Sequence, residues 1–276
     1  MLTTVTVPVE TRAPGGSTNA YLVGRETTLL VDPAARSPSL DEAVTDHGVD
    51  HLAVTHTHRD HVGAVADYAR ETDATVWCRR GRERRFREAT GRTADRTFGE
   101  GTTIPTDPPV TVLDTPGHAP DHVAFAVQRS DATGTGRQSS RATEVLVGDL
   151  AVAEGSVVVG APDGDMVANV LALFRLQARA PERLLPGHGP AINDPQAVLG
   201  RLVDHRLDRE RRVFEAIENG ARDVDAVLDA AYDKDLEGVR DLARATVVAH
   251  VEKLAQEGRV EWSVERERVA LADRFG

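Results

Sequence analysis

Short apolar runs separated by polar turns recur along most of the chain. The run AYLVGRETTLLVD, residues 20–32, predicts two strands around a glycine-containing turn. More runs of strand length follow, at residues 49–58, 74–78, 110–118, 122–128 and 144–150. Residues 60–71 and 165–179 instead carry apolar side chains at helical spacing. Strands that alternate with helices predict a layered α/β (α+β) architecture.

Two segments depart from this alternation. Residues 129–144, RSDATGTGRQSSRATE, are rich in Gly, Ser and Thr and predict a mobile loop between two strands. After residue 194 the pattern predicts three charged helices and then a hairpin at 259–272. Three helices followed by a hairpin are the element order of a winged helix. We therefore expect a larger domain at 1–204 and a small winged-helix-like C-terminal domain at 205–276.

The chain is acidic and contains almost no lysine. Its formal net charge is −11, and its only lysines are Lys234 and Lys253. This balance is typical of proteins from a salt-rich cytoplasm, so we expect a halophilic source. A negative charge disfavours contact with nucleic acid, because phosphates attract Lys and Arg. In about 1 M salt, however, the Debye length falls to about 3 Å and surface repulsion is screened.

Cysteine content and hydropathy exclude several classes of protein. Cys78 is the only cysteine, which excludes an intrachain disulfide and a thiolate-rich zinc site. No run of about 18 apolar residues is present, and residues 1–16 lack the basic and apolar regions of a secretory signal. We expect a cytoplasmic protein without a membrane anchor, in which any metal is bound by imidazole and carboxylate.

Residues 54–64, VTHTHRDHVGA, place three histidines and an aspartate directly after an apolar run. Side chains two apart on an extended segment point the same way, so His56 and His58 can converge on one metal ion. Asp60 and His61 lie past a turn and can face a second ion. Three more candidate ligands stand at strand ends: His118 in LDTPGHAPDH, Asp149 in LVGDL and His188 in LLPGHGP.

These motifs resemble the metallo-β-lactamase superfamily, because HxHxDH, TPGH, GD and PGHG occur in that order across roughly residues 1–200. The resemblance implies a four-layer αββα sandwich. It assigns ligands to two metals: His56, His58 and His118 to the first, Asp60, His61 and His188 to the second, and Asp149 as a bridge. Asp32, which ends the run TLLVD, matches the family's early aspartate, a residue that orients metal ligands.

Such a site would supply hydrolytic chemistry. Two divalent ions about 3.5 to 4 Å apart lower the pKa of bound water from about 15.7 to about 7, so hydroxide is available at neutral pH. Asp60 is the candidate catalytic residue, because its second carboxylate oxygen can hold or accept the nucleophile's proton. The expected cofactors are two divalent metal ions, with zinc first and manganese or iron as alternatives.

Other histidines do not belong to this pattern. A lone histidine is more often a hydrogen-bonding residue of the surface or core than a ligand. We interpret four residues in this way: His47, His51, His205 and His250. His122 and Asp121 follow His118 closely, and support of a ligand and contact with substrate are both open for them.

The pattern also discriminates among branches of the family. Zinc β-lactamases generally lack the bridging aspartate, so we do not expect antibiotic hydrolysis. Glyoxalase II-type thioesterases have it, but this chain has Ala64 where a second glycine is usual, and its C-terminal region does not resemble their glutathione-contacting domain. The nearest likeness is to the β-lactamase-like endoribonuclease branch, through PDGD, LLPGHGP, HRLDRE and the winged-helix-like region. That likeness implies a phosphodiesterase acting on single-stranded RNA.

Two alternatives stay open. One is hydrolysis of a small ester or thioester of the hydroxyacylglutathione type. The other is a nucleic-acid-binding regulator with a vestigial metal site, although the helix at 239–258 mixes basic with acidic residues and a recognition helix is normally more basic. A packing or dimerisation role for the C-terminal region is the simpler interpretation. The sequence predicts no oligomeric state.

Residues 78–88, CRRGRERRFRE, form the most basic stretch of the chain. Arginine binds phosphate in a bidentate way, and Phe86 could stack on an unpaired base. The candidate substrate-binding residues are therefore Arg79, Arg82 and Arg85. The alternative is a solvated helix whose arginines pair with surface acids.

Overall fold

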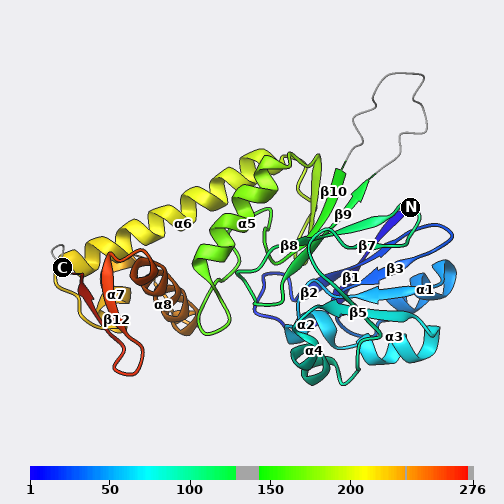
Figure 1. Cartoon of the computed structure of the whole chain (residues 1–276), viewed down its shortest axis with the longest axis horizontal. Helices are drawn as coiled ribbons and strands as arrows, with labels where there is room; N and C mark the ends of the chain where they lie inside the picture. The colour runs from blue at the N-terminus through cyan, green and yellow to red at the C-terminus, as the bar shows by residue number, and fades with distance from the viewer. Residues whose placement is uncertain (129–142, 234, 273–276) are drawn as a thin grey trace, which may run out of the picture.

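The computed structural model describes residues 1–128, 143–233 and 235–272. Two mixed β-sheets, a two-stranded hairpin and the helices around them make up this part of the chain (Figure 1). Most of the loop predicted at 129–144 lies outside the described residues. Its last two residues, Thr143 and Glu144, begin strand β10 (Thr143–Gly148).

The first sheet comes from the N-terminal part of the chain. Its six strands are β1 (Leu2–Pro8), β2 (Ser17–Val23), β3 (Leu29–Val31), β4 (His51–Ala53), β5 (Thr75–Arg79) and β6 (Arg96–Phe98). They lie in sequence order; the first three pair antiparallel, and β3 to β6 pair parallel. The connecting helices are α1 (Pro38–His47), α2 (Arg59–Val62), α3 (Val65–Thr72) and α4 (Glu83–Thr90). The parallel strands β3 and β4 end at one edge, from which Asp32 and the histidine segment emerge.

The second sheet has five strands. They are β7 (Thr103–Ile104), β8 (Val110–Asp114), β9 (Val123–Gln128), β10 and β11 (Arg183–Pro186). Their order is β11-β10-β9-β8-β7, and only β10 and β11 pair parallel. Helix α5 (Met166–Ala178) provides the crossover between these two strands. Parallel neighbours again end together, so Asp149 and His188 leave the sheet at the same edge.

Apolar clusters show how the layers stack. One cluster joins the facing sides of the two sheets, with Phe98 and Phe125 in a T-shaped contact at 5.7 Å between ring centroids. A second joins the first sheet to α1 and α3, through Leu40 and Tyr68. A third joins the second sheet to α5 and α6 (Pro195–Glu218). The two mixed sheets therefore lie face to face with helices on their outer sides, as the sequence predicts.

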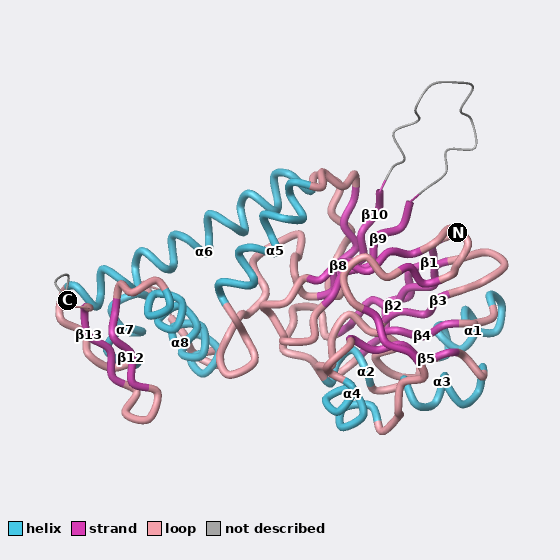
Figure 2. The backbone as a smooth tube through the Cα atoms, viewed as in Figure 1, coloured by secondary structure: helices cyan, strands magenta, loops and turns pink. Residues whose placement is uncertain are grey.

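The C-terminal region has its own apolar cluster. After α6 it contains α7 (Val224–Ala231), α8 (Arg240–Gln256), β12 (Val260–Ser263) and β13 (Arg268–Leu271). Figure 2 shows this region at the end of the molecule away from β1 to β5. The predicted order of helices and hairpin is present. Helix α6, however, runs unbroken through residue 205: Leu202 packs in the cluster beneath the second sheet and Ile217 in the C-terminal cluster, so one helix belongs to both cores.

The structure also describes the single cysteine and the hydropathy of the helices. Cys78 is a free, buried cysteine of the first sheet, and burial raises the pKa of its thiol to about 12. An apolar packing role follows for this residue. In the described ranges, no helix combines the length and apolar character that crossing a bilayer requires.

The continuity of α6 can be tested at Gly200, a glycine in the interior of this helix. A Cβ at this position would meet only the Gln177 Nε2 atom, at 3.6 Å. Gly200→Ala should therefore raise the free energy of unfolding by about 0.5 to 1 kcal/mol, because alanine loses less conformational entropy in a helix. Thermal or urea unfolding measures this change.

Gly91 provides the matched control, because it ends α4 with a φ of 69° and an added Cβ would have open space. Gly91→Ala should lower the free energy of unfolding by about 1 kcal/mol through backbone strain alone. A destabilising Gly200→Ala would contradict a continuous, unstrained α6.

Candidate metal centre

Loops at one edge of the two sheets bring the predicted ligands together. Three sets of side chains have donor atoms within 4.8 Å of one another: His56, His58 and His118; His56, His61 and Asp149; Asp60, His61 and His188. Every ligand named from the sequence occurs in at least one set. His56, His61, Asp149 and His188 are buried and the other three ligands are partly buried, so the cluster is not an exposed acidic surface patch.

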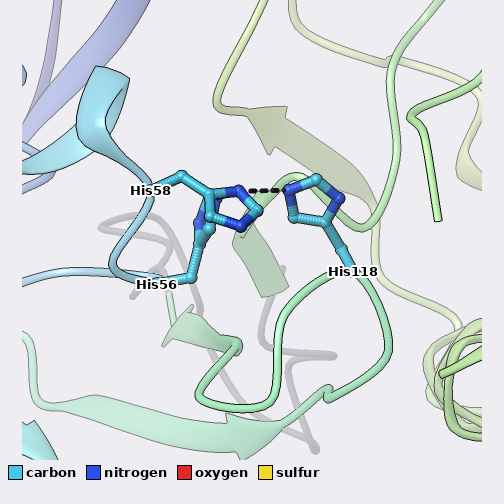
Figure 3. Close-up of side chains that lie close together, drawn as sticks. All are labelled: His56, His58 and His118. Carbon is cyan, nitrogen blue, oxygen red and sulfur yellow. Dashed lines mark hydrogen bonds between the residues drawn. The ribbon is translucent and has the colours of Figure 1, made fainter. Parts of the chain in front are cut away.

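Three imidazoles converge in the first set (Figure 3). His58 Nδ1 lies 3.0 Å from His56 Nε2 and 2.9 Å from His118 Nε2. Burial lowers the pKa of His118 to about 4 and that of His56 well below its ordinary value. Both rings are therefore neutral at pH 7, which is the form that binds a metal ion.

The outer nitrogen of each histidine faces an oxygen atom. For four rings Nδ1 lies against the oxygen, at 3.1 Å from His56 to Thr55 Oγ1, 3.0 Å from His61 to Asp32 Oδ2, 2.7 Å from His118 to the Val158 carbonyl oxygen and 2.8 Å from His188 to the Ser17 carbonyl oxygen. A carbonyl or carboxylate oxygen only accepts, so Nδ1 carries a proton in His61, His118 and His188 and Nε2 is the inward atom. The Thr55 hydroxyl donates to Asp32, so it accepts from His56 Nδ1 in the same way. His58 is turned the other way, with Nε2 3.5 Å from Asp163 Oδ2.

Asp149 lies between the sets of histidines. Its Oδ1 is 3.5 Å from Nε2 of both His61 and His188, and its Oδ2 is 3.5 Å from His118 Nε2. Although burial opposes ionisation, the surrounding histidines hold the pKa of Asp149 below its ordinary value. Oδ1 is buried and has no hydrogen-bond partner among the described residues. An ionised, unsatisfied carboxylate oxygen beside inward lone pairs fits a bound cation.

Asp32 ties the histidine segment to the first sheet. Its carboxylate accepts from the Thr55 backbone N–H at 2.7 Å and from Thr55 Oγ1 at 2.7 Å, and it also contacts His61. Although burial opposes protonation, Asp149 and Asp32 raise the pKa of His61 to about 9. The field around His61 therefore favours positive charge, as a metal-binding pocket requires.

Two glycines of the sequence motifs are required by close approach. A Cβ on Gly148, which has a φ of 46°, would lie 2.6 Å from Thr55 Oγ1 and 2.9 Å from His122 Nε2. A Cβ on Gly187 would lie 2.7 Å from Asp149 Oδ1. The PGHG motif therefore needs glycine because the backbone passes directly beside a ligand, and the GD motif needs it because the backbone passes beside Thr55 and His122, which support ligands.

His122 supports a ligand. Its Nε2 accepts from the Asp149 backbone N–H at 3.1 Å, so its Nδ1 carries the proton and donates to Thr115 Oγ1 at 2.9 Å. Both ring nitrogens are therefore used by the protein. Burial lowers the pKa of this imidazole to about 3, which keeps it neutral.

Two residues near the site are not among the candidates predicted from the sequence. Thr11, in the loop after β1, donates from Oγ1 to Asp60 Oδ2 at 2.5 Å. Asp163, within PDGD, faces His58 and forms an ion pair with Arg85, with 2.5 Å between Oδ2 and Nη2. Both lie far along the chain from the ligand they contact, so only the fold brings each pair together.

The basic stretch on and before α4 is occupied by contacts within the chain. Arg79 donates to Asp114 Oδ2 and to the Pro120 carbonyl oxygen, both at 2.9 Å. Arg85 pairs with Asp163 and lies 3.3 Å from Asp121, and Arg82 is exposed at the start of α4. Phe86 is 1% exposed and packs in the core, so the sequence-based expectation that it could stack on a base is wrong. As the one large apolar residue of α4, it faces inward.

Sequence relatives include proteins named as thioesterases. The chain is 28% identical over 206 residues to thioesterase pkgB of Emericella nidulans, covering 71% of this chain and 53% of that protein. It is 26% identical over 270 residues to atrochrysone carboxyl ACP thioesterase nsrC of Aspergillus novofumigatus, covering 88% and 75%. The beta-lactamase-like protein 2 homolog of Drosophila melanogaster is 27% identical over 277 residues, covering 88% and 84%. The chain thus spans about half the length of pkgB and most of the other two.

Solved structures share the fold over nearly the whole chain. The metallo-beta-lactamase family protein TTHA1429 from Thermus thermophilus superposes with a TM-score of 0.75 at 19% identity, covering 98% of both chains. A beta-lactamase domain protein from Burkholderia ambifaria gives a TM-score of 0.79 at 18% identity, covering 98% of this chain and 91% of that one. The family model described as "Metallo-beta-lactamase superfamily" matches residues 13–188, which include every predicted ligand. The chain therefore belongs to the metallo-beta-lactamase superfamily of metal-dependent hydrolases.

Proposed function

We propose that this protein hydrolyses thioester bonds at a two-metal site. The observation that carries the proposal is the set of imidazole and carboxylate groups that face one another. Asp149 lies within 3.5 Å of a histidine from each half of the set, His61 and His118. Two of the relatives described above are named thioesterases, which supports a thioester as the substrate class. Bound divalent ions would supply hydroxide at neutral pH and polarise the carbonyl group that is attacked.

Different residues of the chain would bind the metals, hold the proton and position the ligands. His56, His58 and His118 would hold the first ion and Asp60, His61 and His188 the second, with Asp149 shared and zinc, manganese or iron as the metal. Asp60 would also hold the nucleophile's proton, because Thr11 fixes its Oδ2 in one orientation. Asp32 and Asp163 would keep His61 and His58 in their binding orientations.

Single-stranded RNA is the competing substrate, and two observations weigh against it. Arg79 and Arg85 are already bound to carboxylates, so they do not offer free guanidinium groups to phosphate. On α8, Arg240, Arg244 and Lys253 are likewise paired with acids. We therefore propose that the winged-helix-like C-terminal region packs against the metal domain and does not bind nucleic acid.

An activity panel tests the substrate class. The metal-loaded protein should hydrolyse acyl thioesters, both on glutathione and on a phosphopantetheine carrier, far faster than single-stranded RNA, a phosphodiester or a β-lactam. His58→Ala should lower kcat/KM for the best substrate by more than about 100-fold, because it removes a metal ligand. Efficient cleavage of RNA with negligible thioester turnover, across a range of salt concentrations, would reverse the proposal.

The role of Asp163 can be tested without an activity assay. Asp163→Asn should weaken metal binding by about 10-fold, because His58 loses the carboxylate that faces its outer nitrogen. Competition between the protein and a chelator measures this affinity. Asp67→Asn is the matched control, since Asp67 forms an ion pair with Arg70 of the same helix, α3. Equal affinities for the two variants would show that Asp163 does not position His58.

A further inference from the structure

Buried basic side chains gather where α6 meets α8. Arg206 of α6 is 3% exposed, and His250 of α8 is fully buried at 0% exposure. The two helices pack against each other at the junction between the sheets and the C-terminal region (Figure 1). Arg206 belongs to HRLDRE, residues 205–210, a motif to which the metal centre gives no role.

Polar atoms of both side chains lack partners among the described residues. Neither ring nitrogen of His250 has a hydrogen-bond partner, and neither does Nε of Arg206. Arg206 does donate from Nη2 to the Val157 carbonyl oxygen at 2.6 Å, which leaves its positive charge without a carboxylate. A buried guanidinium without a counter-charge is strongly unfavourable, so a missing anionic partner is the expected explanation.

Two carboxylates of this region are already paired. Glu210, one turn after Arg206 on α6, lies 2.7 Å from Lys253 Nζ and 3.6 Å from Arg259 Nη1. Glu257 lies 2.5 Å from the same Lys253 Nζ. Neither acid is therefore free to neutralise Arg206.

The remaining groups around His250 are basic. The charges that act on it come from Arg206, Arg209, Lys253 and His205, and together with burial they lower its pKa to about 3. Arg209 lies 3.6 Å above the Tyr232 ring and donates to the Ala231 carbonyl oxygen, and no ion pair joins it to an acid among the described residues. The Arg206 guanidinium is thus a buried positive charge without an acidic partner among the described residues, in a chain that is acidic overall.

We propose that a monovalent anion of halide size binds between α6 and α8, held by Arg206 and His250. The anion would accept the Nε–H of Arg206 and the single N–H of the neutral His250 ring, which gives each side chain a partner and neutralises the guanidinium. A small monovalent anion is the class of ligand we propose because both side chains are buried and a halide needs no specific geometry from its donors.

The anion site is one residue away from a contact of the metal centre. Arg206 binds the carbonyl oxygen of Val157, and the next carbonyl oxygen, that of Val158, accepts from His118 Nδ1. An anion that orders Arg206 therefore also fixes the segment that orients a metal ligand.

Thermal unfolding of the metal-loaded protein tests the proposal with bromide as the probe. Sodium bromide replaces sodium gluconate at constant ionic strength, because gluconate is too large to be enclosed. Tm should rise by roughly 3 °C for each tenfold increase in bromide above its Kd. A general salt effect has the opposite sign, since bromide is the less excluded of the two anions.

Two variants separate the site from the rest of the surface. Arg206→Met should abolish the bromide dependence, because it keeps the length of the side chain and removes its charge. Arg211→Met should retain it, since Arg211 is exposed on the same helix and pairs with Glu215 and Asp208. Bromide-soaked crystals of the unmodified protein should show an anomalous peak between Arg206 and His250. A Tm independent of bromide, or crystals without this peak, would overturn the proposal even if Arg206→Met does not fold.

Discussion

The structure depends on one constraint, the concentration of imidazole and carboxylate groups at a buried edge shared by two sheets. Asp149 is 6% exposed, and its Oδ1 lacks a hydrogen-bond partner in the described part of the chain. Removing such a group from water is unfavourable unless a cation or a donor replaces the lost hydration. The neutral His56 and His118 rings direct Nε2 lone pairs into the same space, so a metal ion is the partner that satisfies both kinds of group.

Support for this site comes from parts of the chain that are distant in sequence. The first sheet contributes Asp32, the loop after β1 contributes Thr11, and the segment before α5 contributes Val158 and Asp163. That last segment is held in turn from the C-terminal side, where the Ala161 N–H donates to the Ala245 carbonyl oxygen of α8 at 3.1 Å. The C-terminal helices thus contact the segment that forms one wall of the candidate metal centre, which agrees with the packing role proposed above.

Much of the site could be predicted because its ligands lie in short motifs at strand ends, where parallel strands must converge. The layering of sheets and helices could be predicted because each apolar run has the spacing of a strand or of a helix. Asp163 and Thr11 could not be predicted, since each contacts its ligand through a loop whose path depends on tertiary packing. The division into domains at residue 205 rests on the change to helices and a hairpin after residue 194 and stays a prediction; the path of α6 through this residue could not be predicted from that pattern. Substrate class was the least predictable, because a metal-bound hydroxide attacks carbonyl and phosphoryl centres alike and the walls of the site decide between them.

The most direct test of a shared two-metal site is an anomalous-scattering crystal structure of the protein reconstituted with zinc. The account predicts two peaks about 3.5 to 4 Å apart, with the Asp149 carboxylate between them and an Nε2 or Nδ1 atom of each ligand histidine directed at one peak. A single peak without Asp149 as a ligand, or no peak after reconstitution, would contradict it.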